Sequence, residues 1–223
     1  AAAGGGAPAD SQKVELPSMA MNAHIGVSIE DAKLVYKDEA MALSNTIDQF
    51  NLRVKDFSLT RKTEMEVWAD LKTAMADLKV EGPLKLIVEL TPEGSGGEFK
   101  SAAVNANFTA DDLTIQKGDL FMKKKGIPAN FKFDGVLSQE NLKLNSAAAK
   151  FHNAEIVVSG SYHQIQGANI KFEAKPIDLK PWSELVPMLK EYELEGRVGL
   201  KGEAKGTADA LQYTANLVAQ NFA

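Results

Sequence analysis

The stretch Leu84-Lys-Leu-Ile-Val-Glu-Leu90 has a leucine or a valine at every second position, with Lys85 and Glu89 among the residues between them. Because successive side chains of a β-strand point to opposite faces of the sheet, this pattern predicts a strand with one apolar and one hydrated face. The same alternation recurs at Ile25, Val27, Ile29; Phe50, Leu52, Val54; Val104, Ala106, Phe108; Phe131, Phe133; Ile156, Val158; Ile170, Phe172; and Val198, Leu200. The fold class predicted by this repetition is all-β.

Glycine, proline and small polar residues separate many of the alternating segments. Residues 91–97 (TPEGSGG), residues 117–119 (KGD) and the pair Asp134-Gly135 are each predicted to turn the chain. Alternating segments joined by short turns favour an antiparallel meander over βαβ units.

Two segments depart from the simple alternation. Residues 64–78 fit both a strand and a helix, because Met65, Trp68 and Met75 are also spaced as on one side of a helix. We favour a strand, since the neighbouring segments are strands. Residues 181–191 (PWSELVPMLKE) predict one short helix with Pro181 in its first turn. Pro187, which has no amide hydrogen to donate, is expected to kink or shorten this helix.

Composition excludes several classes of function. The chain has 223 residues, a net charge of −5 and no cysteine. Its charges are scattered without a basic face, so we do not expect it to bind nucleic acid. The histidines His24, His152 and His163 lie in separate segments, and Ser95 lies in a glycine-rich turn without the strand and helix that flank a nucleophilic serine. We therefore expect no catalytic residues, no metal site, no cofactor and no enzymatic activity.

The two ends of the chain predict its domain organisation. Residues 1–13 are small, glycine-rich and suited to a flexible linker, and residues 14–223 are expected to form one β domain. No run of about 18 apolar residues suggests a membrane-spanning helix. The final alternating residues, Leu211 to Ala219, carry no polar cap, and we expect the chain to be a fragment of a longer, repeat-built protein.

The glycines around Val198 and Leu200 indicate that the sheet bends. Glycine inside a strand is unfavourable unless the sheet curves or another backbone approaches closely. Two architectures remain open: a curved antiparallel sheet forming an open apolar groove, like a half-barrel, and a closed β-sandwich whose two apolar faces cover each other. The triplet Lys123-Lys-Lys125 fits either a solvated hairpin tip or a contact with anionic lipid head groups.

Several stretches together resemble the AsmA-like family of bacterial envelope proteins. They are residues 27–38 (VSIEDAKLVYKD), 47–59 (IDQFNLRVKDFSL), 82–86 (GPLKL) and 177–189 (IDLKPWSELVPML), the last followed by Leu194-Glu-Gly196 and a glycine-spaced strand. The resemblance covers roughly residues 20–223. These are degenerate strand patterns and not catalytic motifs, and the family's amino-terminal membrane anchor is not part of the chain.

The resemblance implies a periplasmic domain whose parent protein is anchored in the inner membrane, similar to chorein-type bridge-like lipid transfer proteins. The implied role is phospholipid transport between membranes and outer-membrane homeostasis, with acyl chains held in an apolar groove. The implied partners are phospholipid acyl chains, the membrane through the anchor, and other envelope proteins. A structural or protein-binding β-sandwich module is the alternative. The residues expected to contact lipid are Phe50, Leu52, Val54, Leu84, Leu86, Val88, Phe131, Phe133, Ile156, Val158, Ile170 and Phe172.

Overall fold

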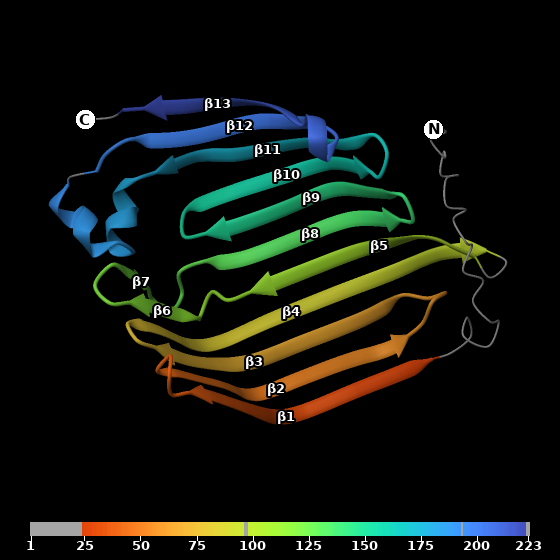
Figure 1. The fold of residues 1–223 in the computed structure, drawn as a ribbon, viewed down its shortest axis with the longest axis horizontal. Coiled ribbons are helices and arrows are strands. Elements are labelled where there is room, and N and C mark those ends of the chain that lie inside the picture. The colour runs from red at the N-terminus through yellow and green to blue at the C-terminus, as the bar shows by residue number, and fades with distance from the viewer. Residues whose placement is uncertain (1–23, 96–97, 193, 222–223) are drawn as a thin grey trace, which may run out of the picture.

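The strands form one 13-stranded antiparallel sheet (Figure 1). The computed structural model describes residues 24–95, 98–192 and 194–221. The strands are β1 (Ile25–Asp38), β2 (Leu43–Phe57), β3 (Thr63–Met75), β4 (Leu78–Ser95), β5 (Glu98–Thr109), β6 (Thr114–Lys117), β7 (Phe121–Lys123), β8 (Ala129–Ser138), β9 (Asn141–Phe151), β10 (Ala154–His163), β11 (Gly167–Asp178), β12 (Arg197–Gly206) and β13 (Gln212–Gln220). Three short 3-10 helices accompany them: η1 (Lys180–Glu184), η2 (Pro187–Glu191) and η3 (Ala208–Ala210). The all-β prediction is confirmed.

The order of the strands in space follows their order in the chain. Each strand pairs with the next one, except that the β6–β7 hairpin leaves this path, so that β5 pairs with β8 and β6 pairs with β4. All strands of the described residues belong to this one sheet, and its two edges, β1 and β13, do not pair with each other. The closed β-sandwich that the sequence left open is therefore not the fold of the described residues.

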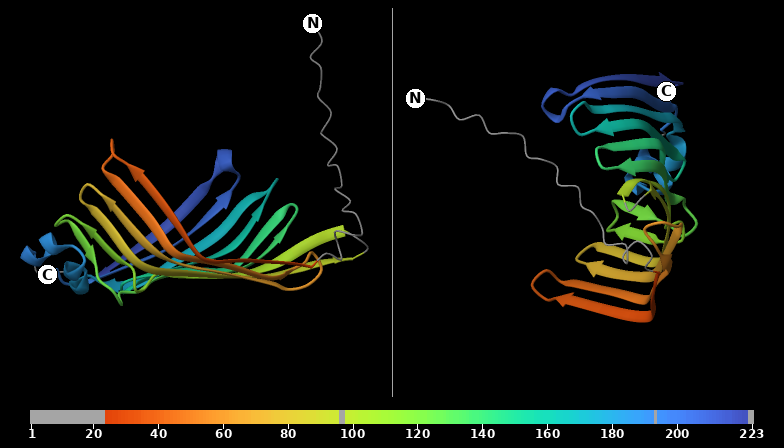
Figure 2. Two further views of the ribbon diagram at one scale, coloured as in Figure 1. Left: turned by 90° about the horizontal axis from the view of Figure 1, so that it is seen from below. Right: turned by 90° about the vertical axis from the view of Figure 1, so that its right-hand side faces the viewer.

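The sheet is twisted and bowed. In both views of Figure 2, the outer strands at each end of the sheet turn toward the same side of its middle strands. Backbone irregularities contribute to this bending in β1 and β2, where the register shifts near Ala32 and where Asp31, Gln49 and Asp56 have positive φ angles. Such bulges bend a strand and increase its twist.

The ambiguous segment 64–78 is extended up to Met75, as the sequence analysis favoured, and a turn at residues 76–77 then leads into β4. β3 pairs with β4 without a register shift from Thr63, opposite Leu90, to Met75, opposite Leu78. It lies between β2 and β4, so both of its edges are hydrogen-bonded within the sheet. A helix at this place would leave the facing edges of β2 and β4 without their hydrogen-bonding partners.

The single helix predicted for residues 181–191 is wrong. The structure has two separate 3-10 helices, η1 and η2, with Val186 between them in an extended conformation (φ −121°, ψ 91°). Pro187 explains the interruption, since it has no N–H to donate and its ring would clash with the preceding helical turn. It instead occupies the first turn of η2, where no amide hydrogen is needed.

One predicted turn is strand in the structure, and another is shorter than predicted, because the chain reverses between Ser95 of β4 and Glu98 of β5, at the end of the predicted range 91–97. β4 continues through Pro92, which lies opposite Ala102 of β5, and ends only at Ser95. β8 likewise runs through Asp134 and Gly135. Both strands are longer than the spacing of the turn signals suggested. The predicted linker at residues 1–13 lies outside the described residues.

Candidate apolar site on the sheet

The pairing register aligns apolar residues into rows that cross the sheet. The first apolar row consists of Val27, Val54, Met65, Val88, Ala106, Phe133, Ala147, Val158, Phe172, Gly202 and Ala215. The second apolar row consists of Ile29, Leu52, Val67, Leu86, Phe108, Phe131, Ala149, Ile156, Ala174, Leu200 and Leu217. Each row contains one residue from every strand except the β6–β7 hairpin, and neither is interrupted by a polar side chain.

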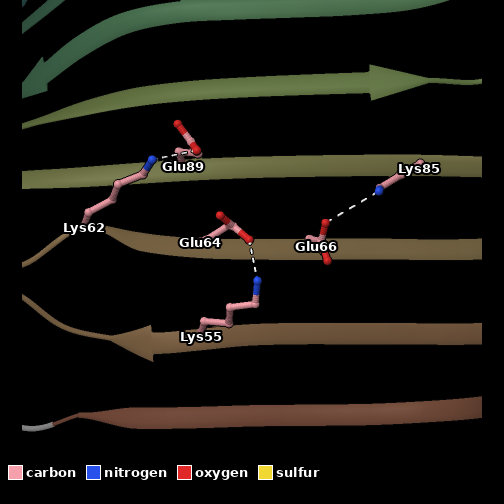
Figure 3. A network of polar contacts seen from close by, with 6 residues as sticks. All are labelled: Lys55, Lys62, Glu64, Glu66, Lys85 and Glu89. Atoms are coloured by element: carbon pink, nitrogen blue, oxygen red, sulfur yellow. Dashed lines mark hydrogen bonds and ion pairs between the residues drawn. The ribbon is translucent and has the colours of Figure 1, made fainter.

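The opposite face of the sheet is mainly polar. The row between the two apolar rows reads Ser28, Arg53, Glu66, Ile87, Asn107, Lys132, Ala148, Val157, Glu173, Lys201 and Asn216. Figure 3 shows ion pairs on this face that link β2, β3 and β4. Lys55 Nζ lies 2.8 Å from a carboxylate oxygen of Glu64, and Lys62 Nζ lies 2.7 Å from one of Glu89.

The residues predicted to contact lipid lie on the strand faces that these apolar rows define. Nine of them belong to the two rows, and Ile170 lies in a third, shorter row that also contains Leu90, Val104 and Leu144. Leu84 and Phe50 lie on the same sides of β4 and β2 as Leu86 and Leu52. None of the predicted residues is buried, and Phe131 and Ile156 are 39% and 45% exposed. The structure therefore gathers them on one open face and not in an enclosed pocket.

The prediction left out part of the apolar face. Val27 and Ile29 of β1, Met65 and Val67 of β3, and Leu217 of β13 occupy the same rows as the predicted residues. Their alternation was visible in the sequence, although the helical spacing within β3 obscured it there. What alternation cannot reveal is which residues of neighbouring strands lie side by side.

Two phenylalanine rings lie close over glycines of this face. A Cβ atom on Gly202 would come within 2.5 Å of Cζ of Phe172, the residue opposite it on β11. A Cβ atom on Gly135 would come within 3.0 Å of Cζ of Phe133, two residues before it on β8. Each ring thus occupies the space above a residue without a side chain. This placement limits how far the rings project from the sheet.

The apolar face lies on the side toward which the sheet bends. Figure 3 looks onto the polar face. The order of the strands from top to bottom is the same in Figures 1 and 3, but each strand arrow points in the opposite horizontal direction, so the two figures view opposite faces of the sheet. Figure 1 therefore looks onto the apolar face. In Figure 2 the outer strands turn toward the viewer of Figure 1, which is upward in the left panel and leftward in the right panel.

The polar face carries shallow hollows. One, of about 470 Å³, is lined mostly by this face, including Ile87, Asn107, Lys132 and Ala148. Another, of about 530 Å³, lies between residues such as Val157, Lys171 and Lys201. Neither contains a histidine, and among the described residues no group of three or more histidine and acidic side chains could hold a metal ion. The histidines His152 and His163 lie at opposite ends of β10.

A small packed cluster lies at one end of the sheet, where η1, η2 and the β6–β7 hairpin meet (Figure 1). This end cluster consists of Phe121, Phe151, Trp182 and Leu185. The rings of Phe121 and Phe151 stack with centroids 6.2 Å apart, and Trp182 lies 6.3 Å from Phe151. Leu185 is fully buried, and its carbonyl accepts a hydrogen bond from the amide of Met122 at 2.7 Å.

Lys123, next to the end cluster, is almost completely buried. Its amine donates to the backbone carbonyls of Asp111 and Leu113 at 2.8 and 2.7 Å. Burial lowers the pKa of this amine, and the nearby carboxylates of Asp111 and Asp112 act in the opposite direction. The prediction that the whole triplet Lys123-Lys125 is solvated or contacts head groups is wrong for Lys123, which satisfies buried carbonyls instead.

Asp111 joins the segment after β5 to the start of β8. Its Oδ1 accepts hydrogen bonds from the amide of Ala129 at 2.6 Å and from Nδ2 of Asn130 at 3.2 Å. The bond from Ala129 is the main cause of the lowered pKa of this carboxyl group. Asp111 thus has a structural role in the turn that follows β5.

Comparison with known protein families, curated proteins and solved structures found no match to this chain. Within residues 24–95, 98–192 and 194–221, no helix is both long and apolar enough to cross a membrane.

Proposed function

We propose that the apolar face holds the acyl chains of phospholipids, and that the domain acts in lipid transport without chemical catalysis. The observation that carries this proposal is the pair of uninterrupted apolar rows on a face that no other described element covers at its centre. A soluble protein seldom leaves so large an apolar surface in water, and such surfaces usually have a partner.

The chemistry of the face suits an acyl chain. An acyl chain has no hydrogen-bonding groups, and neither row offers a polar side chain that would need a partner. Each methylene group removed from water contributes about 0.8 kcal/mol. Several methylenes lying along Leu86, Phe131 and Phe133 are enough for reversible binding, and no acid, base or metal is required.

The curvature of the sheet supports an open groove, similar to a half-barrel, as the shape of the binding surface. Because the apolar face lies on the side toward which the sheet bends, an acyl chain there would contact residues from several strands at once. The resemblance to AsmA-like envelope proteins adds the setting of this proposal: a periplasmic domain, an inner-membrane anchor in the parent protein, and a role in outer-membrane homeostasis.

Site-specific photo-crosslinking tests the proposal directly. A benzophenone amino acid at Phe133 faces the proposed lipid site, and the same group at Lys132, the next residue of β8, faces the polar side. In cells, we expect lipid adducts at position 133 and not at position 132. Mass spectrometry of the purified, irradiated protein identifies the adducts. Equal lipid labelling at both positions, or none at either, contradicts the proposal.

A charged substitution provides the second arm of the test. Phe133→Asp should abolish binding of a fluorescent phospholipid, because the carboxylate would lose water on contact with an acyl chain. Since Phe133 is only half-buried, the variant should keep a cooperative unfolding transition. Lys132→Asp is the matched control and should bind like the wild type. Loss of cooperative unfolding in Phe133→Asp would mark this position as core, in favour of a structural or protein-binding module.

A further inference from the structure

The two edges of the sheet differ in how they are protected against pairing with another chain. β1 contains the charged residues Glu30, Asp31, Lys33, Lys37 and Asp38, and its register with β2 shifts at three places. Charges and bulges on an edge strand discourage the addition of a further strand. β1 therefore has the features of a permanent edge.

β13 has none of these features. Its sequence, QYTANLVAQ, contains no charge and no proline, and it pairs with β12 from Gln212 to Gln220 without a register shift. All of its residues are exposed, including Tyr213 at 78% and Leu217 at 69%. An undistorted, uncharged edge strand presents a regular row of free N–H and C=O groups to any strand of matching pattern.

The side chains of β13 match a second copy of the same strand. In an antiparallel pair centred on Asn216, Tyr213 lies opposite Ala219, and Ala215 lies opposite Leu217. A large apolar side chain thus meets a small one at each position of the apolar face. On the polar face, Gln212 lies opposite Gln220 and Thr214 lies opposite Val218, and no like charges meet. Shifting the pairing by one residue would place the apolar faces of the two sheets on opposite sides.

We propose that β13 pairs with β13 of a second copy of this chain, antiparallel and about a two-fold axis at Asn216. The two sheets then form one larger sheet with both apolar faces on the same side, because a two-fold axis perpendicular to the sheet preserves its faces. This inference rests on the chemistry of the edge and is independent of the proposed lipid binding.

Cysteine cross-linking tests both the pairing and its register, because the native chain contains no cysteine. In Asn216→Cys the two thiols are directly opposite, with Cβ atoms about 4.5–5.5 Å apart, close to the separation of about 3.5–4.5 Å in a disulfide. Mild oxidation should convert this variant to a covalent dimer. The control is Val35→Cys, on the exposed part of β1, and Leu217→Cys should also react poorly, because it faces Ala215 of the other copy.

Sedimentation equilibrium gives the second measurement. The wild type should dimerise reversibly, and Asn216→Lys, which places two like charges opposite each other, should weaken dimerisation by at least about tenfold. Val35→Lys should leave dimerisation unchanged. A monomeric wild type at high micromolar concentration overturns the proposal. If Leu217→Cys cross-links faster than Asn216→Cys, the proposed register is wrong. If a mixture of Asn216→Cys and Val35→Cys forms cross-links between positions 216 and 35, β13 pairs with β1 of another copy and not with β13.

Discussion

The end cluster and the middle of the apolar face use similar side chains in opposite ways. In the end cluster, Leu185 is fully buried and Phe151 contacts two other aromatic rings. In the middle of the face, Leu86 and Phe133 remain partly exposed, although they lie in continuous apolar rows. The sequence can therefore bury a large apolar side chain, and among the described residues it does so fully at Leu185, where η1, η2 and the β6–β7 hairpin meet at the end of the sheet. The open part of the face is a feature of the architecture.

Replacing a leucine with alanine should give the largest difference in stability between the end cluster and the middle of the apolar face. Leu185→Ala should lower the free energy of unfolding by about 2–4 kcal/mol, because it leaves a cavity in a fully packed site. Leu86→Ala should cost about 1 kcal/mol, since Leu86 is partly exposed and its truncation leaves no enclosed cavity. Urea unfolding followed by tryptophan fluorescence and circular dichroism gives both values. Equal losses would mean that Leu86 belongs to a core that the structure does not reveal.

A smaller effect, dependent on pH, is expected next to the end cluster. The folded state lowers the pKa of Asp111 through the hydrogen bond from Ala129, so the ionised carboxylate stabilises the fold. This contribution is present above the unfolded pKa of about 3.9, and it is lost as the pH falls toward the lower folded value. Asp111→Asn should cost about 1–2 kcal/mol at pH 7.

Unfolding measured at a series of pH values checks this prediction. The difference in stability between the wild type and Asp111→Asn should shrink as the pH falls below about 4. Asp112→Asn is a suitable control because Asp112 is more exposed than Asp111. A difference that stays constant down to pH 2 would show that the charge of Asp111 does not stabilise the fold.

The smallest effect is expected on the polar face. Lys62 and Glu89 form an ion pair of 2.7 Å, but their side chains are 54% and 37% exposed (Figure 3). Lys62→Ala should change the free energy of unfolding by less than about 1 kcal/mol. The effect should disappear in 1 M salt, where the screening length is about 3 Å. A larger loss that persists in salt would indicate packing of the lysine stem and not charge.

Alternation in the sequence was enough to predict the all-β fold and to assign residues to the faces of their strands. Leu84 to Leu90 and Ile156 to Val158 lie in β4 and β10 with the expected alternation. Period-two alternation reports which face a side chain occupies, and it contains no information about register. The alignment of Phe133 with Ala106 and Ala147 follows from pairing with two neighbours and could not be predicted from β8 alone.

A prediction from the sequence was wrong where residues distant in the chain determine the environment of a side chain. Lys123 resembles its solvated neighbours Lys124 and Lys125, and only the carbonyls of Asp111 and Leu113 explain its burial. The predicted helix at residues 181–191 failed for a local reason, since the effect of Pro187 was underestimated as a kink and is a complete break.

The correspondence between sequence order and spatial order has a consequence for how the chain folds. Each hairpin from β1 to β5 can dock on the strand before it without waiting for a distant segment, which keeps the loops that must close short. The exception is the step from β5 to β8, where residues 110–128 must be arranged first. The polypeptide can therefore fold progressively from its amino-terminal side as it is synthesised, with one slower step near its middle.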